Sequence, residues 1–158
     1  MAINPNTTFT AGSILTADQQ NRFPRGVMQL ASSTSNYTLT TSVAIATGMT
    51  VTFTAVANRN YKITYHEPQA QTANITSFTA TQIRVTNAAG TQLQSGIVQT
   101  VSAAIVNGSI ANTYIGTFAA GSTTIVGCAS CTSTSGAPVL SRAATTPAFL
   151  LVEDIGPA

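Results

Sequence analysis

Alternation of apolar and polar residues is the feature that most constrains this chain, since it recurs along most of the sequence after Gly26. Residues 49–56 read Met-Thr-Val-Thr-Phe-Thr-Ala-Val, and residues 60–67 read Asn-Tyr-Lys-Ile-Thr-Tyr-His-Glu. A period of two places alternate side chains on opposite faces of a strand, and no window has a helical period of useful length. The expected strands are 27–32, 49–56, 60–67, 81–87, 97–106, 111–119, 122–129, 139–143 and 148–153.

Turn-forming residues separate these strands, because Asn and Gly tolerate the backbone conformations that tight turns require. The turn signals are Asn58-Arg-Asn, Asn87-Ala-Ala-Gly, Asn107-Gly-Ser, Ala120-Gly-Ser and Ser135-Gly-Ala-Pro. Many short strands at a spacing of roughly 8–12 residues are typical of an antiparallel sandwich or barrel. With 158 residues in all, the sequence predicts one all-β domain over residues 26–158.

Residues 1–25 differ in character, because they are polar and have no alternating pattern. One helical turn is expected over Thr16–Asn21, where Thr16 can cap the turn and Asp18 suits its positive end. Pro24 prevents the turn from continuing. We therefore expect an extended N-terminal arm that docks on another surface. Its apolar anchors are Phe9, Ile14, Leu15 and Phe23.

Charged residues make up only 6% of the chain, with six Lys and Arg, four Asp and Glu, and a net charge of +2. A typical soluble domain has about a quarter of its residues charged, so this surface must be built from Thr, Ser, Asn and Gln. We expect much of it to be buried in an oligomer or larger assembly; the alternative is a neutral surface that is simply soluble. The cations form no basic run, so no nucleic-acid partner is expected.

Catalysis needs a nucleophile or base that is positioned by a second group, and this chain has few candidates. They are His66, Asp18, Glu67, Glu153 and Asp154. Neighbours on a strand point to opposite faces, so His66 and Glu67 should not pair, and both are expected at a solvent-exposed strand end before Pro68. Glu153 and Asp154 alone supply too few oxygens for calcium. We expect no enzymatic activity and no catalytic residues.

The two cysteines, Cys128 and Cys131, lack the two further ligands of a zinc site and the helix start of a thioredoxin-like motif. We expect them to be free thiols in or beside a strand, and we expect no metal or other cofactor. The N-terminus lacks the basic and apolar regions of a signal peptide. No stretch reaches the ~18 apolar residues of a transmembrane helix, so no membrane insertion is expected.

Four tyrosines alternate with small polar residues: Tyr37, Tyr61, Tyr65 and Tyr114. Most are expected in the core or on a sheet face. The alternative is a sugar-binding platform, for which Tyr37 and Tyr114 are the candidate exposed residues. Such a platform would make the chain a free carbohydrate-binding module, which has no need of an arm.

Three segments carry a resemblance. Residues 9–21 read Phe-Thr-Ala-Gly-Ser-Ile-Leu-Thr-Ala-Asp-Gln-Gln-Asn, with Pro24-Arg-Gly after them, and residues 147–157 read Pro-Ala-Phe-Leu-Leu-Val-Glu-Asp-Ile-Gly-Pro. Residues 51–64 form a strand–turn–strand element in which Asn58 stands where Gly is usual, and Asn tolerates the left-handed turn conformation. In this order the segments resemble the opening, central hairpin and ending of small virion structural proteins of tailed bacteriophages, of the minor tail, tail-fibre or head-fibre type.

The resemblance implies a trimeric β-sandwich head, of jelly-roll topology, that the arm of residues 1–25 attaches to other virion proteins. It implies a location on the tail or capsid surface and no enzymatic activity. Two roles fit it. The leading one is a tail or fibre appendage that contacts a glycan or protein on the host surface. The other is a capsid decoration protein that stabilises the shell, and the sequence does not decide between them.

Overall fold

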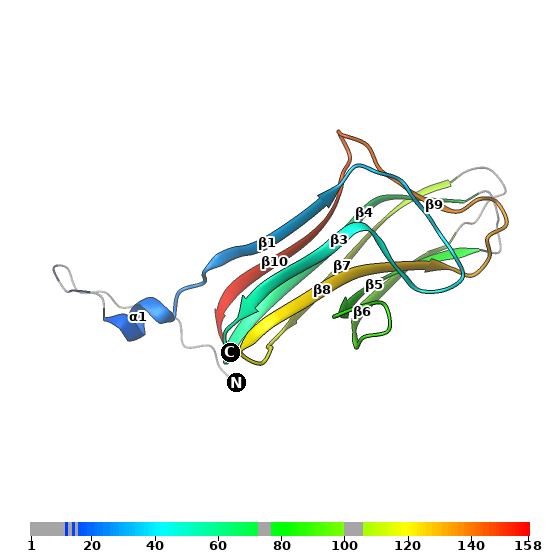
Figure 1. The fold of residues 1–158 in the computed structure, drawn as a ribbon. Helices are drawn as coiled ribbons and strands as arrows, with labels where there is room; N and C mark the ends of the chain where they lie inside the picture. The colour runs from blue at the N-terminus through cyan, green and yellow to red at the C-terminus, as the bar shows by residue number, and fades with distance from the viewer. Residues whose placement is uncertain (1–11, 13, 15, 73–76, 100–105) are drawn as a thin grey trace.

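The computed structural model describes residues 12, 14, 16–72, 77–99 and 106–158, and most of these form two antiparallel β-sheets packed face to face (Figure 1). The first sheet has the order β1 (Gly26–Ser33), β10 (Ala148–Pro157), β4 (Arg59–Thr72), β7 (Val106–Gly116). The second has the order β3 (Ala44–Ala55), β8 (Gly121–Cys131), β5 (Phe78–Val85), β6 (Gln92–Gln99). Two short strands continue the first sheet beyond the start of β10, namely β9 (Val139–Ser141) beside β4 and β2 (Tyr37–Thr38) beside β9.

The eight long strands form a jelly roll. Successive long strands alternate between the two sheets, except for the β5–β6 hairpin, which stays in the second sheet. This alternation winds the chain around the core so that each sheet combines strands from both halves of the sequence. The predicted all-β antiparallel sandwich is therefore confirmed, with the topology that the resemblance implied.

The alternating residues face the core as predicted. Tyr61, Ile63 and Tyr65 of β4 are buried between the sheets, opposite Val51 and Phe53 of β3. The rings of Phe53 and Tyr61 lie 5.0 Å apart, within the range of favourable aromatic contacts. The rest of the core is aliphatic and includes Ile83, Ile125, Leu140, Leu150 and Val152.

Several of the predicted strands have different bounds in the structure, and β6 and β7 differ in position. β6 covers residues 92–99 where a strand was expected over 97–106, and β7 begins at Val106 where 111 was expected. β6 is an edge strand with a single neighbour, so little of its side-chain pattern is buried and its alternation is weak. Gly96 also interrupts the pattern, because a Cβ there would lie 2.2 Å from Asn112 Oδ1.

The expectation that Glu67 lies at a solvent-exposed strand end is wrong. β4 continues through Pro68 to Thr72, with a register shift between Glu67 and Ala70 that accommodates the proline. Glu67 is fully buried, and its carboxylate accepts hydrogen bonds from Arg142 Nε at 2.9 Å and Arg142 Nη2 at 2.5 Å. Both partners are inaccessible to solvent, so this is a buried ion pair rather than a surface contact.

Arg142 also joins the loop between β1 and β2 to strand β3. Its Nη1 donates to the Thr47 carbonyl at 2.8 Å and to the Ser35 carbonyl at 3.2 Å. The Tyr65 hydroxyl donates to Glu67 Oε1 at 2.5 Å. Burial, and after it the charge of Glu67, raises the pKa of Tyr65 well above its ordinary value, so the hydroxyl stays protonated and remains a donor.

Replacing one partner of the Glu67–Arg142 pair should destabilise the sandwich, because the other charge would be left buried and unpaired. We expect Arg142→Met to lower the free energy of unfolding by about 3–5 kcal/mol, measured by urea denaturation followed by circular dichroism. The double variant Glu67→Leu, Arg142→Met should lose less than the sum of the two single variants. Arg84→Met, which removes a half-buried arginine on the outer surface, is the matched control. An equal loss of unfolding free energy in this control would contradict the role of the Glu67–Arg142 pair in stability.

Candidate attachment site at the base of the sandwich

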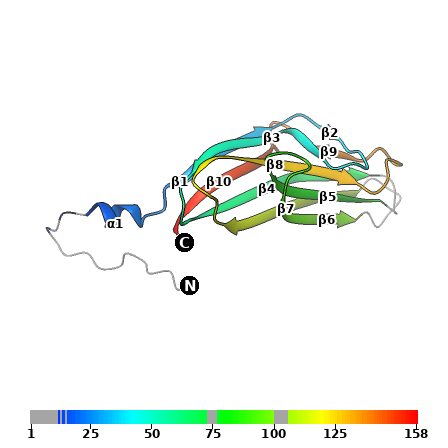
Figure 2. The same ribbon diagram turned by 60° about the horizontal axis from the view of Figure 1, so that its bottom comes forward.

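The arm joins the sandwich at its base, which is the end where β1 begins and β10 ends (Figure 2). It contains α1 (Ala17–Asn21), in which Gln20 N donates to the Thr16 carbonyl at 3.0 Å. The helical turn predicted over residues 16–21 is therefore confirmed. α1 lies beyond the ends of both sheets and does not form part of the sandwich (Figures 1 and 2).

Arg59, the first residue of β4, fixes the end of the arm to the sandwich. Its Nε and Nη2 donate to the Asp154 carboxylate at 2.5 and 2.8 Å. Its Nη1 donates to the Asn21 carbonyl at 2.5 Å, and its Nη2 donates to the Phe23 carbonyl at 2.6 Å. Because Arg59 and Asp154 are both buried, these charge-assisted bonds hold the chain just after α1 in one position.

The opening, hairpin and closing motifs of the sequence meet at this contact. Asn58 has a φ of 60°, the left-handed conformation expected of it, and the Tyr61 hydroxyl accepts a hydrogen bond from Val56 N at 2.8 Å across the same turn. In β10, Gly156 N donates to Asp154 Oδ1 at 2.9 Å, where the register with β4 shifts. The end of the opening motif at Asn21, the turn of the hairpin motif and the end of the closing motif therefore meet at the junction between arm and sandwich.

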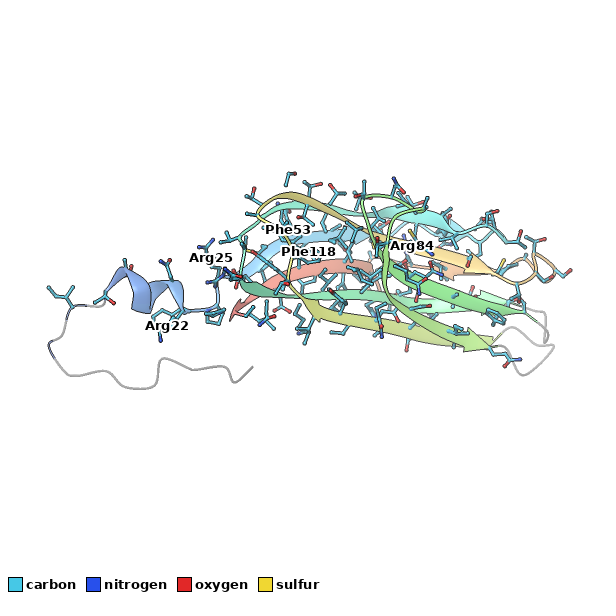
Figure 3. All side chains as sticks on the ribbon, turned by 90° about the horizontal axis from the view of Figure 1, so that it is seen from below. Arg22, Arg25, Phe53, Arg84 and Phe118 are labelled. Carbon is cyan, nitrogen blue, oxygen red and sulfur yellow. The ribbon has the colours of Figure 1, made fainter. Side chains whose placement is uncertain are left out.

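An open cavity of about 430 Å³ lies beside the junction. Arg22, Arg25 and Arg59 contribute to its wall, and Figure 3 shows Arg25 at the end of the sandwich with Arg22 further out on the arm. The Arg25 side chain is 45% exposed, and its Nε lies 4.0 Å from Asp154 Oδ2. Three guanidinium groups against one buried carboxylate make this wall basic, so it suits carboxylate or carbonyl groups of a docking protein.

The predicted arm anchors differ in how the structure describes them. Ile14 is 91% exposed and Phe23 is 39% exposed, so the chain itself leaves both apolar side chains at least partly in solvent. Phe9 and Leu15 lie outside the described residues. The exposure of Ile14 agrees with an arm whose apolar side chains are covered by another protein.

The candidate binding tyrosines pack against the core. Tyr37 of β2 and Tyr114 of β7 are both half-buried and contact the core cluster, and the Tyr114 ring lies 6.3 Å from that of Phe118. Burial raises the pKa of Tyr37. Neither ring presents a fully exposed face of the kind on which a sugar stacks.

The remaining candidate chemical groups also have structural neighbours. The His66 ring stacks on Phe149 at 5.2 Å, and Glu153 Oε2 lies 3.1 Å from Lys62 Nζ. No group of three metal-ligating side chains is found among the described residues. In the same part of the chain, no helix is long and apolar enough to span a bilayer. These contacts give each side chain a role in packing or surface charge.

Cys128 and Cys131 are buried free cysteines on β8, as predicted. Three residues of strand separate their Cα atoms by roughly 10 Å, too far for a disulfide. Burial raises the pKa of both thiols, more than the charge of Arg84 lowers that of Cys128. The thiols therefore stay protonated and lack the thiolate character of reactive cysteines.

Comparisons with known proteins give little further guidance. No protein-family model matches the chain, and no curated protein matches it. It is similar to a solved "Structure of infectious bursal disease virus Gt strain" at 13% identity and a TM-score of 0.27, covering 85% of this chain and 43% of that one. For the Gx strain of the same virus the identity is 15% and the TM-score 0.24, covering 85% and 41%. The chain spans less than half of either matched chain, and TM-scores this low establish no relationship.

The two thiols should be unreactive in the folded protein, because burial blocks access and the raised pKa keeps them protonated. At mildly alkaline pH we expect a chromogenic disulfide reagent to titrate almost no thiol in the native state and two per chain in denaturant. Ser130→Cys, at a half-exposed position between them on β8, is the matched control and should react as a third thiol without denaturant. Rapid native reaction of Cys128 or Cys131 would contradict their burial.

Arg59→Lys should loosen the arm, because lysine can still pair with Asp154 but has no planar fork to reach the Asn21 and Phe23 carbonyls at the same time. We expect trypsin to cleave at Arg22 and Arg25 at least about tenfold faster in this variant, since cleavage requires local release of the junction. Mass spectrometry of a digestion time course measures the rate. Arg84→Lys, away from the arm, is the control and should leave the cleavage rate unchanged. Equal cleavage rates in the wild type and both variants would contradict the role of Arg59 in holding the arm.

Proposed function

We propose that this chain is a structural protein of a tailed-bacteriophage virion, in which the arm attaches a trimeric sandwich to the particle. The observation that carries the proposal is the meeting of the three resembling motifs at one place. They build the junction around Arg59 and Asp154, from which the arm leaves. A junction of this kind fits a protein whose arm leaves the sandwich in a fixed direction.

The two ends of the molecule differ, and this difference supports the role of an appendage. The Arg-lined cavity and the start of β1 lie at the base, whereas the loops before β3 and before β10 lie at the opposite end, which we call the distal end (Figure 1). β2 and β9 brace two of these distal loops against β4. Attachment at the base thus leaves the distal loops free to contact a host surface, as in a tail or head fibre.

The ionisable groups support a structural rather than an enzymatic role. Glu67 and Asp154 are buried and paired with Arg142 and Arg59, so neither carboxylate is open to contact with a substrate. Glu153 is paired with Lys62 on the outer surface. Catalysis would require at least one such group free in a cleft.

Deleting residues 1–20 should leave a folded sandwich that no longer joins particles. This truncation keeps Asn21 and Phe23, which Arg59 binds, so the junction stays intact. We expect an unchanged thermal midpoint by circular dichroism and at least about tenfold less protein on particles assembled without the wild-type chain, because each lost apolar anchor is worth about 1.5–3 kcal/mol. Quantitative mass spectrometry of purified particles measures the copy number.

A point variant separates the anchor from the length of the arm. Ile14→Asp should reduce incorporation without affecting folding, since Ile14 is 91% exposed. Thr54→Asp, at an exposed position on β3, is the matched control and should incorporate normally. Truncated protein found on particles at the normal copy number would place attachment in the sandwich and overturn the role of the arm.

A further inference from the structure

The outer surface of the first sheet, which we call the aliphatic face, carries apolar side chains at both of its edges. Pairing places Val27 of β1 beside Glu153 of β10, Glu153 beside Lys62 of β4, and Lys62 beside Ile115 of β7. Val27 is 62% exposed and Ile115 is 58% exposed. The row therefore has an aliphatic residue at each edge and an ion pair of 3.1 Å between them.

The neighbouring rows extend this face. Leu30 of β1, 57% exposed, lies beside Leu151 of β10, and Leu151 lies beside Thr64 of β4. In the next row Phe149 lies against His66. At the base end of β10, Ile155 is also exposed. Leu30, Leu151 and Phe149 are neighbours on β1 and β10 and form a contiguous apolar patch, and contiguous exposed apolar surface can mark an interaction site.

The outer surface of the second sheet has a different character. Thr50, Thr52 and Thr54 of β3 are exposed there, and Thr52 Oγ1 lies 2.8 Å from Thr124 Oγ1 of β8. Arg84 of β5 lies among polar neighbours, with hydrogen bonds to two glutamine side chains and a backbone carbonyl. The exposed aliphatic residues of this sheet, Ile45 and Ile97, lie on its two opposite edge strands, β3 and β6, and do not form a patch. The first sheet differs, because Leu30 and Leu151 lie side by side on β1 and β10, and Ile115 lies on the opposite edge beyond Lys62.

Charge and symmetry identify the occupant of the aliphatic face. Lys62 and Glu153 neutralise each other, so the face has no net charge. It therefore does not need a partner of opposite charge and is complementary to an equally uncharged surface. The two apolar edges lie on opposite sides of the ion pair, on β1 and β7. In a closed ring each copy presents one edge to the copy before it and the other edge to the copy after it, which is the heterologous contact of a cyclic trimer.

We propose that the aliphatic face is the trimer interface, with Val27 and Leu30 on β1 of one copy packed against Ile115 on β7 of the next. This inference rests on the trimeric head of the proposed function and adds the surface and the pairing of its edges. Lysine at Leu30 or Ile115 places an unpaired charge in the contact and prevents association. Because both side chains are exposed in the single chain, folding is unaffected.

Mass measurement tests the face. Multi-angle light scattering at micromolar concentration should give three times the chain mass of 16.2 kDa for the wild type and for the matched control Thr54→Lys on the second sheet. Leu30→Lys and Ile115→Lys should each give 16.2 kDa with unchanged circular dichroism. Trimeric lysine variants, or a monomeric wild type, would overturn the inference. Lysine variants that stay trimeric but are lost from particles would assign the face to another virion protein and leave the proposed function intact.

Cross-linking tests the pairing of edges. Under mild oxidation the double variant Val27→Cys, Ile115→Cys should form covalent trimers, whereas either single variant should stay uncrosslinked, because each new thiol meets only the other edge. The wild type is the background control, since Cys128 and Cys131 are buried. Covalent dimers of a single variant would indicate a two-fold contact between identical edges and overturn the cyclic arrangement.

Discussion

The buried ion pair between Arg59 and Asp154 is the contact on which the polarity of the molecule depends. It joins the first residue of β4 to the end of β10 and, through two further hydrogen bonds of Arg59, to the chain that follows α1. Burying a charge is costly unless every bond is satisfied, so this arrangement tolerates little displacement of any of the three segments. One residue thereby sets the register of β4 against β10 and the point where the arm leaves.

The second buried pair performs the same task at the other end of β4, where Glu67 and Arg142 hold the distal loops to both sheets. Together the two pairs use four of the ten charged residues of the chain inside the sandwich. Few charges are left for the outer surface, which explains its dependence on threonine. A surface with so little charge favours association, and we propose the aliphatic face as the place where it occurs.

Local pattern was enough to predict most of the strands, their buried faces and the helical turn, because alternation and turn chemistry act between near neighbours in sequence. It failed at Asn107-Gly-Ser, which was expected to form a turn but lies within β7. The ion pairs could not be predicted in this way. Arg59 and Asp154 are 95 residues apart, and Glu67 and Arg142 are 75 residues apart, so only the folded topology brings them together. Glu67 was misassigned because Pro68 suggested a strand end, whereas a bulge absorbs the proline. A signal for this pair was present in the sequence, because Glu67 and Arg142 both occupy positions at which the alternating pattern places side chains in the core.

Strand β1 links attachment to assembly, since it receives the arm at Gly26 and carries Val27 and Leu30 on the aliphatic face. In the proposed cyclic trimer the three-fold axis relates the three bases to one another, so the three chains enter their β1 strands at equivalent positions around that axis. Once one arm is bound, the other two arms are held at a high effective concentration near their binding sites. Three weak contacts then give firm attachment together. The same geometry turns the three sets of distal loops away from the particle, so that a single strand direction fixes both the anchored end and the presented end.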